Sequence, residues 1–199
     1  MSSDLPLVAA YADESCLGNG REGDNPGGAG VLIEYRRPNG ALERRDVWIS
    51  EPATTNNRMA LRSVISTMRA LTKPARVVFT SDSKYLIDGL TEWVFGWAAR
   101  GWTRKTGAIE NLELWTEALD SVHRGGHQVA WRWVKGHNGH PQNEYANHLA
   151  TRAAADQTAS YGVTISAFDA WVGTQKKLRP LAEFPDAKAF VASRALPRR

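Results

Sequence analysis

The sequence predicts an α/β fold in which a mixed sheet is flanked by helices. Short apolar runs at residues 7–12 and 77–80 have the length and composition of buried strands. A hairpin pattern and several segments with apolar residues at helical spacing surround them. The order along the chain is strand, hairpin, helix, strand, helices, strand and helix, and this order describes a mixed sheet with helices on its faces.

The first strand, at residues 7–12, is followed by a segment at 15–30 that is rich in Gly, Asn and charge and is expected to be a loop. Two β-rich runs, at 31–35 and 43–49, are separated by Pro38-Asn39-Gly40. A short Pro-Asn-Gly connection between two such runs is typical of a β-hairpin.

The next predicted element is a helix that residues 54–57 can cap, because Thr and Asn side chains accept hydrogen bonds from the first turn. Pro74 is expected to end it, and a strand follows at 77–80. The apolar positions of this helix are Leu61, Val64, Ile65, Met68 and Leu71.

The second half of the domain alternates between helices and one strand. Helices are expected at 83–90, 111–122 and 141–155, the last with Pro141 suited to a first turn. A strand is expected at 128–134, and the stretch 93–106 is unusually rich in Trp, Arg and Lys. We therefore assign residues 1–157 to one domain and residues 158–199 to a C-terminal extension, with a candidate short helix at 168–177.

Composition limits the class of protein. The chain is 42% hydrophobic and 23% charged, which excludes a disordered or fibrous protein. No apolar run approaches the ~20 residues that a membrane-spanning helix needs, and no secretory signal precedes the first strand. The single cysteine, Cys16, forms no intramolecular disulfide and suits a reducing compartment. We expect a cytoplasmic monomer without membrane contact.

The net charge of +4 resides in the extension. Residues 158–199 hold seven Lys or Arg and three acids, so their balance is 7 − 3 = +4 and the remainder is neutral. A basic extension favours anionic partners such as nucleic acid. It can equally be a solvated segment, or it can pack on the domain through Phe168, Trp171 and Phe184.

Two aspartates follow predicted strands and are the strongest functional signal. Asp13 follows the strand at 7–12 and Asp82 follows the strand at 77–80. Carboxyl ends of neighbouring strands meet at one edge of a sheet, where open α/β folds place their sites. Two adjacent acids repel each other, and a divalent cation relieves that repulsion. With the polar turn at 135–140, they indicate a metal-dependent enzyme that acts on nucleic acid.

The motifs along the chain resemble those of type 1 ribonuclease H, over about residues 7–157. The resemblance implies a five-stranded mixed sheet and hydrolysis of the RNA strand of RNA–DNA hybrids with two divalent ions, Mg²⁺ or alternatively Mn²⁺. The motifs are Tyr11-Ala12-Asp13-Glu14-Ser15-Cys16, Thr54-Thr55-Asn56-Asn57-Arg58-Met59, Thr80-Ser81-Asp82-Ser83, Trp131-Arg132-Trp133-Val134-Lys135-Gly136-His137, and Gly139-His140-Pro141 followed by Asn143-Glu144.

The resemblance also assigns roles to residues. Asp13, Asp82 and Asn147 match metal-ligand positions, and His137 matches a mobile loop histidine that assists proton transfer or product release. The stretch 93–105 matches a basic protrusion that grips the DNA strand, and within it Trp93 and Trp97 are expected to pack inward. Positions that match substrate contacts are Asn19, Thr55, Asn56, Asn57, Lys84, Trp93, Asn111, Trp115 and Lys135.

Two ligand positions depart from the family pattern. Ala60 stands where the family has Glu, and Asn147 stands where it has Asp. Asn keeps an oxygen that can ligate an ion, but Ala offers none, so weaker metal binding is expected. Ala60 can be a substitution that traps an inactive form, in which case Ala60→Glu should raise cleavage strongly.

Ala60 is also compatible with two natural origins. The chain can be a natural variant with a rearranged ligand set, for which Glu14 is a candidate. Strand alternation argues against Glu14, because neighbouring residues on a strand face opposite sides. The chain can also be a relative that binds hybrids without cutting them, and a cleavage assay separates that binding module from an enzyme.

Overall fold

The computed structural model describes residues 5–18 and 25–199. Its centre is a six-stranded mixed sheet with the order β5-β4-β1-β2-β3-β6. β1 pairs parallel with β4, which pairs parallel with β5, whereas β2, β3 and β6 join by antiparallel pairing. The strands are β1 (Leu7–Cys16), β2 (Gly27–Arg36), β3 (Leu42–Glu51), β4 (Arg76–Ser81), β5 (Gln128–Trp133) and β6 (Thr164–Ile165).

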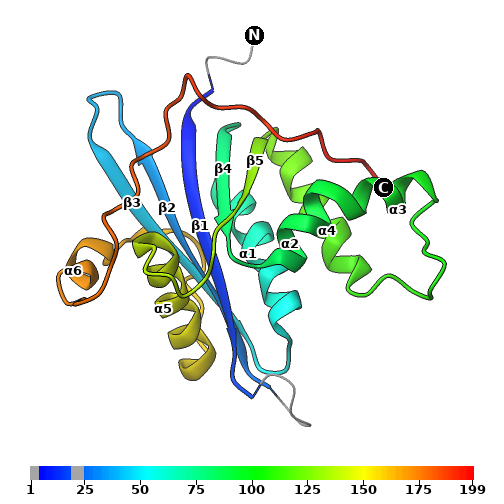
Figure 1. The fold of residues 1–199 in the computed structure, drawn as a ribbon, viewed down its shortest axis with the longest axis horizontal. Coiled ribbons are helices and arrows are strands. Elements are labelled where there is room, and N and C mark those ends of the chain that lie inside the picture. The colour runs from blue at the N-terminus through cyan, green and yellow to red at the C-terminus, as the bar shows by residue number, and fades with distance from the viewer. Residues whose placement is uncertain (1–4, 19–24) are drawn as a thin grey trace.

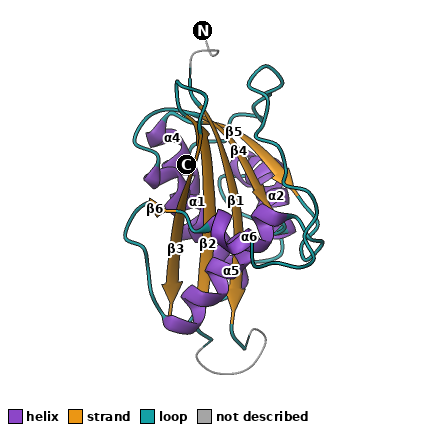
Figure 2. Cartoon of the chain, turned by 90° about the vertical axis from the view of Figure 1, so that its left-hand side faces the viewer, coloured by secondary structure: helices purple, strands orange, loops and turns teal. Residues whose placement is uncertain are grey.

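Helices cover both faces of the sheet. Figure 1 shows α1 to α4 on one side and α5 and α6 on the other, and Figure 2 shows α5 and α6 lying in front of the strands. The main core lies between the sheet and the α1–α4 side, and a smaller core lies under α5 and α6. The helices are α1 (Asn56–Ala70), α2 (Lys84–Asp88), the π-helical turn η1 (Gly89–Trp93), α3 (Val94–Ala99), α4 (Leu112–Gly125), α5 (Pro141–Asp156) and α6 (Phe168–Val172).

Two glycines of β2 let α5 approach the sheet closely. A Cβ atom at Gly30 would overlap the backbone of α5 at Ala146, and one at Gly28 would overlap it at Ala150. The small residues on α5 complete this contact, so its backbone lies against β2 and its first turn lies beside β1. This close approach brings the start of α5 to the end of β1.

Most predicted elements are confirmed, with longer strands. The segment at 15–30 is only partly a loop, because β1 runs to Cys16 and β2 begins at Gly27. Antiparallel pairing continues as far as Cys16 with Gly27, so backbone hydrogen bonds hold polar and glycine-rich sequence in strands. Thr55 caps α1 as expected, its hydroxyl accepting a hydrogen bond from the Arg58 amide at 3.3 Å.

The C-terminal extension packs on the domain and adds a sixth strand to the five expected. β6 pairs with the outer edge of β3. Phe168 is fully buried in the smaller core, and Trp171 and Phe184 pack around it. At the opposite edge, the Ser193 amide donates to Val129 of β5 at 2.8 Å. Both edges of the sheet are therefore covered by the extension, whose path across the molecule is orange to red in Figure 1.

Within residues 5–18 and 25–199, no helix is both long and apolar enough to cross a bilayer.

Candidate active site

Three carboxylates meet where β1 runs past the end of β4. Asp13, Glu14 and Asp82 each offer an oxygen atom within 4.8 Å of those of the other two. Ala12 is the last residue of β1 that pairs with β4, at Ser81, so Asp82 leaves β4 level with Asp13. The two aspartates are thus brought together as expected, by the strand pairing itself.

Glu14 belongs to this cluster, and the expectation that strand alternation would keep it away is wrong. Beyond Ala12, β1 has no strand beside it on the β4 side among the described residues. The longer glutamate side chain can therefore cross this free edge, where it lies close to Asp82 and Ser83. Strand alternation still determines the face of the sheet on which the Glu14 side chain begins. It does not determine where the carboxylate of such a long side chain lies when no strand is paired beside it.

The electrostatics of the cluster favour a bound cation. Burial, together with the Asp82 carboxylate, raises the pKa of Asp13 from its usual 3.8 to about 8. Burial and then the Asp13 charge raise the pKa of Glu14 well above its usual range, and burial also raises the pKa of Asp82. Three crowded carboxylates that resist ionisation form the oxygen-rich, negatively charged donor set that a divalent ion such as Mg²⁺ requires.

A buried asparagine of α5 lies against the carboxylates. The Asn143 amide nitrogen donates to Asp13 Oδ2 at 2.6 Å, and the Glu14 amide donates to Asp13 Oδ1 at 2.7 Å. Asn143 is 4% exposed, and its Oδ1 is buried without a hydrogen-bond partner in the described part of the chain. An unsatisfied buried oxygen beside the carboxylates is consistent with a site that a hydrated cation fills.

The predicted ligand positions on the helices differ in what they offer. Asn147 lies one turn beyond Asn143 on α5, is half-buried, and its side chain makes no hydrogen bond among the described residues. Ala60 is completely buried on α1, in the same core cluster as Ala12 of β1. Glu14 starts from the same face of β1 as Ala12, so it emerges on the α1 side of the sheet.

The turn after β5 lies directly against the cluster. A Cβ atom at Gly136 would overlap the Asp82 carboxylate, so a side chain there would have to displace that carboxylate. The next residue, His137, has a left-handed backbone (φ 49°) and is exposed. His137 therefore lies at the rim of the carboxylate cluster.

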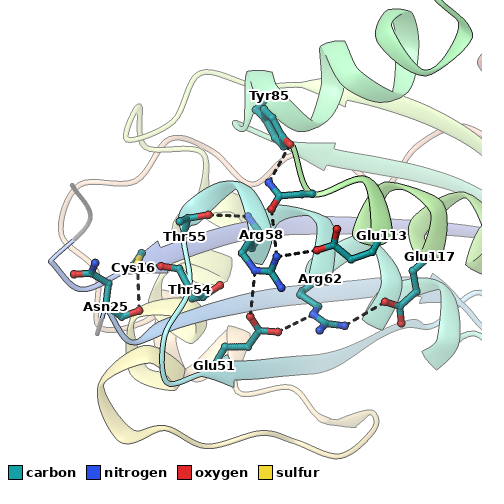
Figure 3. A network of polar contacts seen from close by, with 11 residues as sticks. Cys16, Asn25, Glu51, Thr54, Thr55, Arg58, Arg62, Tyr85, Glu113 and Glu117 are labelled. Atoms are coloured by element: carbon teal, nitrogen blue, oxygen red, sulfur yellow. Dashed lines mark hydrogen bonds and ion pairs between the residues drawn. The ribbon is translucent and has the colours of Figure 1, made fainter. Parts of the chain in front are cut away.

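The predicted substrate residues at the start of α1 line one hollow. It has a volume of about 390 Å³ and is lined by Thr55, Asn56, Asn57, Arg58, Glu110 and Asn111. Asn56 Oδ1 is buried there without a partner among the described residues. Arg58 donates to Asn111 Oδ1 at 3.3 Å and to Glu113 Oε1 at 2.9 Å, and thereby holds this wall in place. Figure 3 shows the contact between Arg58 and Glu113.

A network of ion pairs stabilises the start of α1, which forms this wall of the hollow. Arg62 contacts Glu51 of β3 at 2.7 Å and Glu117 of α4 at 3.3 Å (Figure 3). Arg58 lies 4.0 Å from the other oxygen of Glu51. Because these pairs join β3, α1 and α4, they fix the orientation of the α1 N-terminus relative to the sheet.

The tryptophans among the remaining substrate candidates differ in how exposed their side chains are. Trp115 is fully buried, with its indole nitrogen donating to Tyr85 Oη at 3.0 Å, so a direct contact between Trp115 and a substrate is excluded. Trp97 packs inward as expected, but Trp93 does not, being 36% exposed. Trp93 stands on η1, whose wider turn carries it to the surface beside Tyr85.

Two predicted lysine contacts are exposed. Lys84 lies over the exposed Trp133 ring, 5.1 Å from its centroid, and Lys135 follows β5. Trp133 in turn donates to the Asp82 carbonyl at 3.0 Å, which places this pair beside the carboxylates. Asn19 lies outside the described residues.

Asn143 and Gly136 occur in the motifs above without a role, and sequence reasoning missed what they do. The signal for Asn143 was its position one helical turn before Asn147, since residues four apart share a helix face. The close approach of Gly136 to Asp82 depends on the tertiary packing of a turn, and the sequence carries no signal for it.

Comparisons with known proteins agree with this arrangement. The family model described as RNase H matches residues 6–155. The ribonuclease H of Methylococcus capsulatus is 42% identical over 153 residues, covering 76% of this chain and 92% of that protein. The ribonuclease H of Polaromonas sp. is 44% identical over 146 residues, covering 73% and 86%.

Solved structures extend the likeness to the C-terminal segment. LC9-RNase H1, described as a type 1 RNase H with the type 2 active-site motif, is 61% identical with a TM-score of 0.87, covering 97% of this chain and 94% of that one. The foamy viral protease–reverse transcriptase in complex with an RNA/DNA hybrid has a TM-score of 0.60 at 15% identity, covering 78% and 21%. At that identity the likeness concerns the fold alone.

Proposed function

Because this chain belongs to the ribonuclease H family, we propose that it is an endoribonuclease that hydrolyses the RNA strand of RNA–DNA hybrids with the help of divalent metal ions. The observation that carries this proposal is the cluster of the buried Asp13 with the half-buried Glu14 and Asp82 at the edge of the sheet. Mg²⁺, or Mn²⁺ in its place, suits such an all-oxygen donor set. Two such ions, when bound with substrate, supply an activated water and stabilise the leaving oxygen.

Glu14 is proposed to fill the ligand position that Ala60 leaves empty. Its carboxylate lies with those of the two aspartates, and it starts from the α1 side of the sheet. The donor set then carries three formal negative charges, with Asn147 as a neutral fourth position. A relative at 61% identity, described as a type 1 enzyme with another type's active-site motif, supports a natural rearrangement rather than an inactivating substitution.

The chain's own residues bind and orient the substrate. Asn143 holds the Asp13 carboxylate by its 2.6 Å hydrogen bond, and His137 stands at the rim, where an imidazole can take up or release a proton. Thr55, Asn56 and Asn57 offer donors and acceptors that can distinguish a 2′-hydroxyl from its absence.

The DNA strand is proposed to lie over the protrusion. Trp93 presents an exposed ring on η1, and Lys84 and Lys135 present exposed cations nearer to the carboxylates. Aromatic rings can stack on bases or sugars while cations neutralise backbone phosphates.

The test is a cleavage assay on an end-labelled RNA–DNA hybrid, with single-stranded RNA, duplex RNA and duplex DNA as competing substrates. We expect hybrid-specific cleavage with Mg²⁺ or Mn²⁺, none in EDTA, and loss of cleavage in Asp82→Asn. Asp120→Asn, on the far helix α4, is the matched control and should cleave normally. Cleavage that persists in EDTA, or no cleavage with either ion, contradicts the proposal.

A hybrid-binding module without catalysis is the second candidate, and Ala60 is the observation that favours it, because it offers no ligand atom. Tight hybrid binding without cleavage under any metal condition would establish this alternative.

A further inference from the structure

The C-terminal extension forms one wall of a second hollow, next to the active-site turn. This hollow has a volume of about 400 Å³. His137, Gly139 and Glu144 line it from the domain, and Lys176 and Lys177 line it from the extension. The match to the family model ends at residue 155, so these lysines lie outside the matched region.

Backbone contacts fix the extension to the turn that carries His137. The Arg179 amide donates to the Gly139 carbonyl at 2.8 Å. The Gly139 amide donates to Glu144 Oε1 at 3.2 Å, so this acid, which lines the hollow, is already engaged with the loop. The position of Lys177 relative to His137 is therefore set by the fold, since only one residue separates Lys177 from the bonded Arg179.

The hollow adjoins the carboxylate cluster. Gly136, next to His137, abuts the Asp82 carboxylate, and Asn143, next to Glu144, donates to Asp13. The hollow therefore lies beside the place where a phosphate held at the carboxylates would be.

The two lysines present their charges to solvent. Both are exposed, and neither forms an ion pair in the part of the chain that the structure describes. Other cations of the extension are in contact with aromatic rings instead: Arg194 lies 4.1 Å from the Phe95 ring centroid and Arg199 lies 6.0 Å from that of Trp102.

We propose that Lys176 and Lys177 bind backbone phosphates of the RNA strand beside the cleavage site, so that the extension is part of the substrate-binding surface. This inference rests on the proposed function. A flexible ammonium is suited to a phosphate as a point charge, without base specificity, so these contacts add affinity to hybrids of any sequence.

The experiment compares Lys176→Ala/Lys177→Ala with Lys188→Ala in the full-length protein. Lys188 belongs to the same extension and is exposed, but its neighbour Ala187 accepts a hydrogen bond from Arg76, at the opposite end of β4 from Asp82. Hybrid affinity is measured in EDTA, where no cleavage occurs, at several salt concentrations between 50 and 300 mM. Steady-state cleavage with Mg²⁺ is measured alongside.

Each lost phosphate contact should weaken binding about eightfold at 0.1 M salt and make the slope of log K against log salt less negative by roughly 0.9. The double variant should therefore bind about 60-fold more weakly, with a slope change near 2, a higher KM and a nearly unchanged kcat. Lys176→Arg/Lys177→Arg should restore binding, and Lys188→Ala should behave like the parent.

The outcomes separate the two proposals. If the parent protein neither binds nor cleaves hybrid, the proposed function fails. If the parent binds and cleaves but the double Ala variant keeps its affinity and salt slope, only the role of the lysines fails. A fall in kcat at unchanged KM also overturns that role, because it indicates that the change disturbs the His137 turn instead.

Discussion

Glu14→Gln is the substitution that most directly tests the proposed ligand set. The change keeps the size and hydrogen-bonding reach of the side chain and removes one of three charges. The three carboxylates lie within 4.8 Å of one another, and at an effective dielectric constant of about 20 each ionised pair repels by roughly 3.5 kcal/mol. The variant should therefore be more stable than the parent without metal, by up to a few kcal/mol at pH 9, and should bind Mg²⁺ more weakly.

The expected effect on catalysis is a loss of at least about 100-fold in kcat/KM, because a missing ligand also displaces the groups that orient the substrate. The assays are hybrid cleavage at varied Mg²⁺ and thermal unfolding with and without Mg²⁺. Glu183→Gln, an exposed acid of the extension, is the matched control for losing one negative charge.

Ala60→Glu tests the same ligand assignment in the opposite direction, by adding a carboxylate at position 60. Position 60 is completely buried, and with Glu14 in place an added side chain there should cost roughly 1–3 kcal/mol of stability without raising activity. Combined with Glu14→Gln, it should restore part of the lost cleavage. If Ala60→Glu alone raises cleavage strongly and Glu14→Gln changes nothing, Glu14 is not a ligand and Ala60 is an inactivating substitution.

Three further substitutions probe other parts of the structure. Asn147→Asp adds a fourth negative charge near the cluster, so half-maximal activity should need roughly tenfold less Mg²⁺, measured by metal titration; no change would remove position 147 from the ligand set. Burial lowers the pKa of His127 below its usual 6.5, so its contribution to stability is complete above pH 6.5 and is lost as pH falls below it, by at most about 1.4 kcal/mol per pH unit. His127→Gln should flatten that part of the curve of unfolding free energy against pH, and an unchanged curve would contradict the assignment. Phe168→Ala removes a fully buried ring by which the extension packs on the domain and should cost about 3–5 kcal/mol in denaturant unfolding; a cost below 1 kcal/mol would show that the extension is not anchored there.

The fold was predictable because its strands and helices follow local patterns. The strand before Asp82 and the Pro141 helix start were both placed correctly from apolar runs and breakers. Strand ends were not, because residues such as Gly27 and Glu14 have no local preference for a strand and are held there by pairing. The π-helical turn at Gly89–Trp93 likewise has no sequence signature, and it turned Trp93 outward against expectation.

The extension was predictable in part. Packing on the domain through its aromatic residues was one of the uses that the sequence left open, and it is the one observed. The pairing of β6 with β3 involves only Thr164 and Ile165, too short a segment for any periodicity to show. Its basic composition suggested contact with nucleic acid, yet Arg194 and Arg199 lie against aromatic rings, whereas Lys176 and Lys177 line the hollow beside His137. The net charge of the extension does not tell which cations contact aromatic rings and which face the hollow.

On the proposed assignment of Glu14 as a ligand, the geometry of the carboxylate cluster explains how a ligand can move from one element to another while the site stays in place. A glutamate on α1 reaches the sheet edge from one face, and a residue on β1 two positions beyond Ala12 starts from that same face. Because β4 ends at Ser81, the side chain at position 14 meets no neighbouring strand there and can reach Asp82. If Glu14 supplies that carboxylate, position 60 no longer needs one and can hold a small apolar residue of the main core, to which Ala12 also belongs. On this argument the alanine follows from the glutamate on β1, and the two positions should be exchanged together rather than singly.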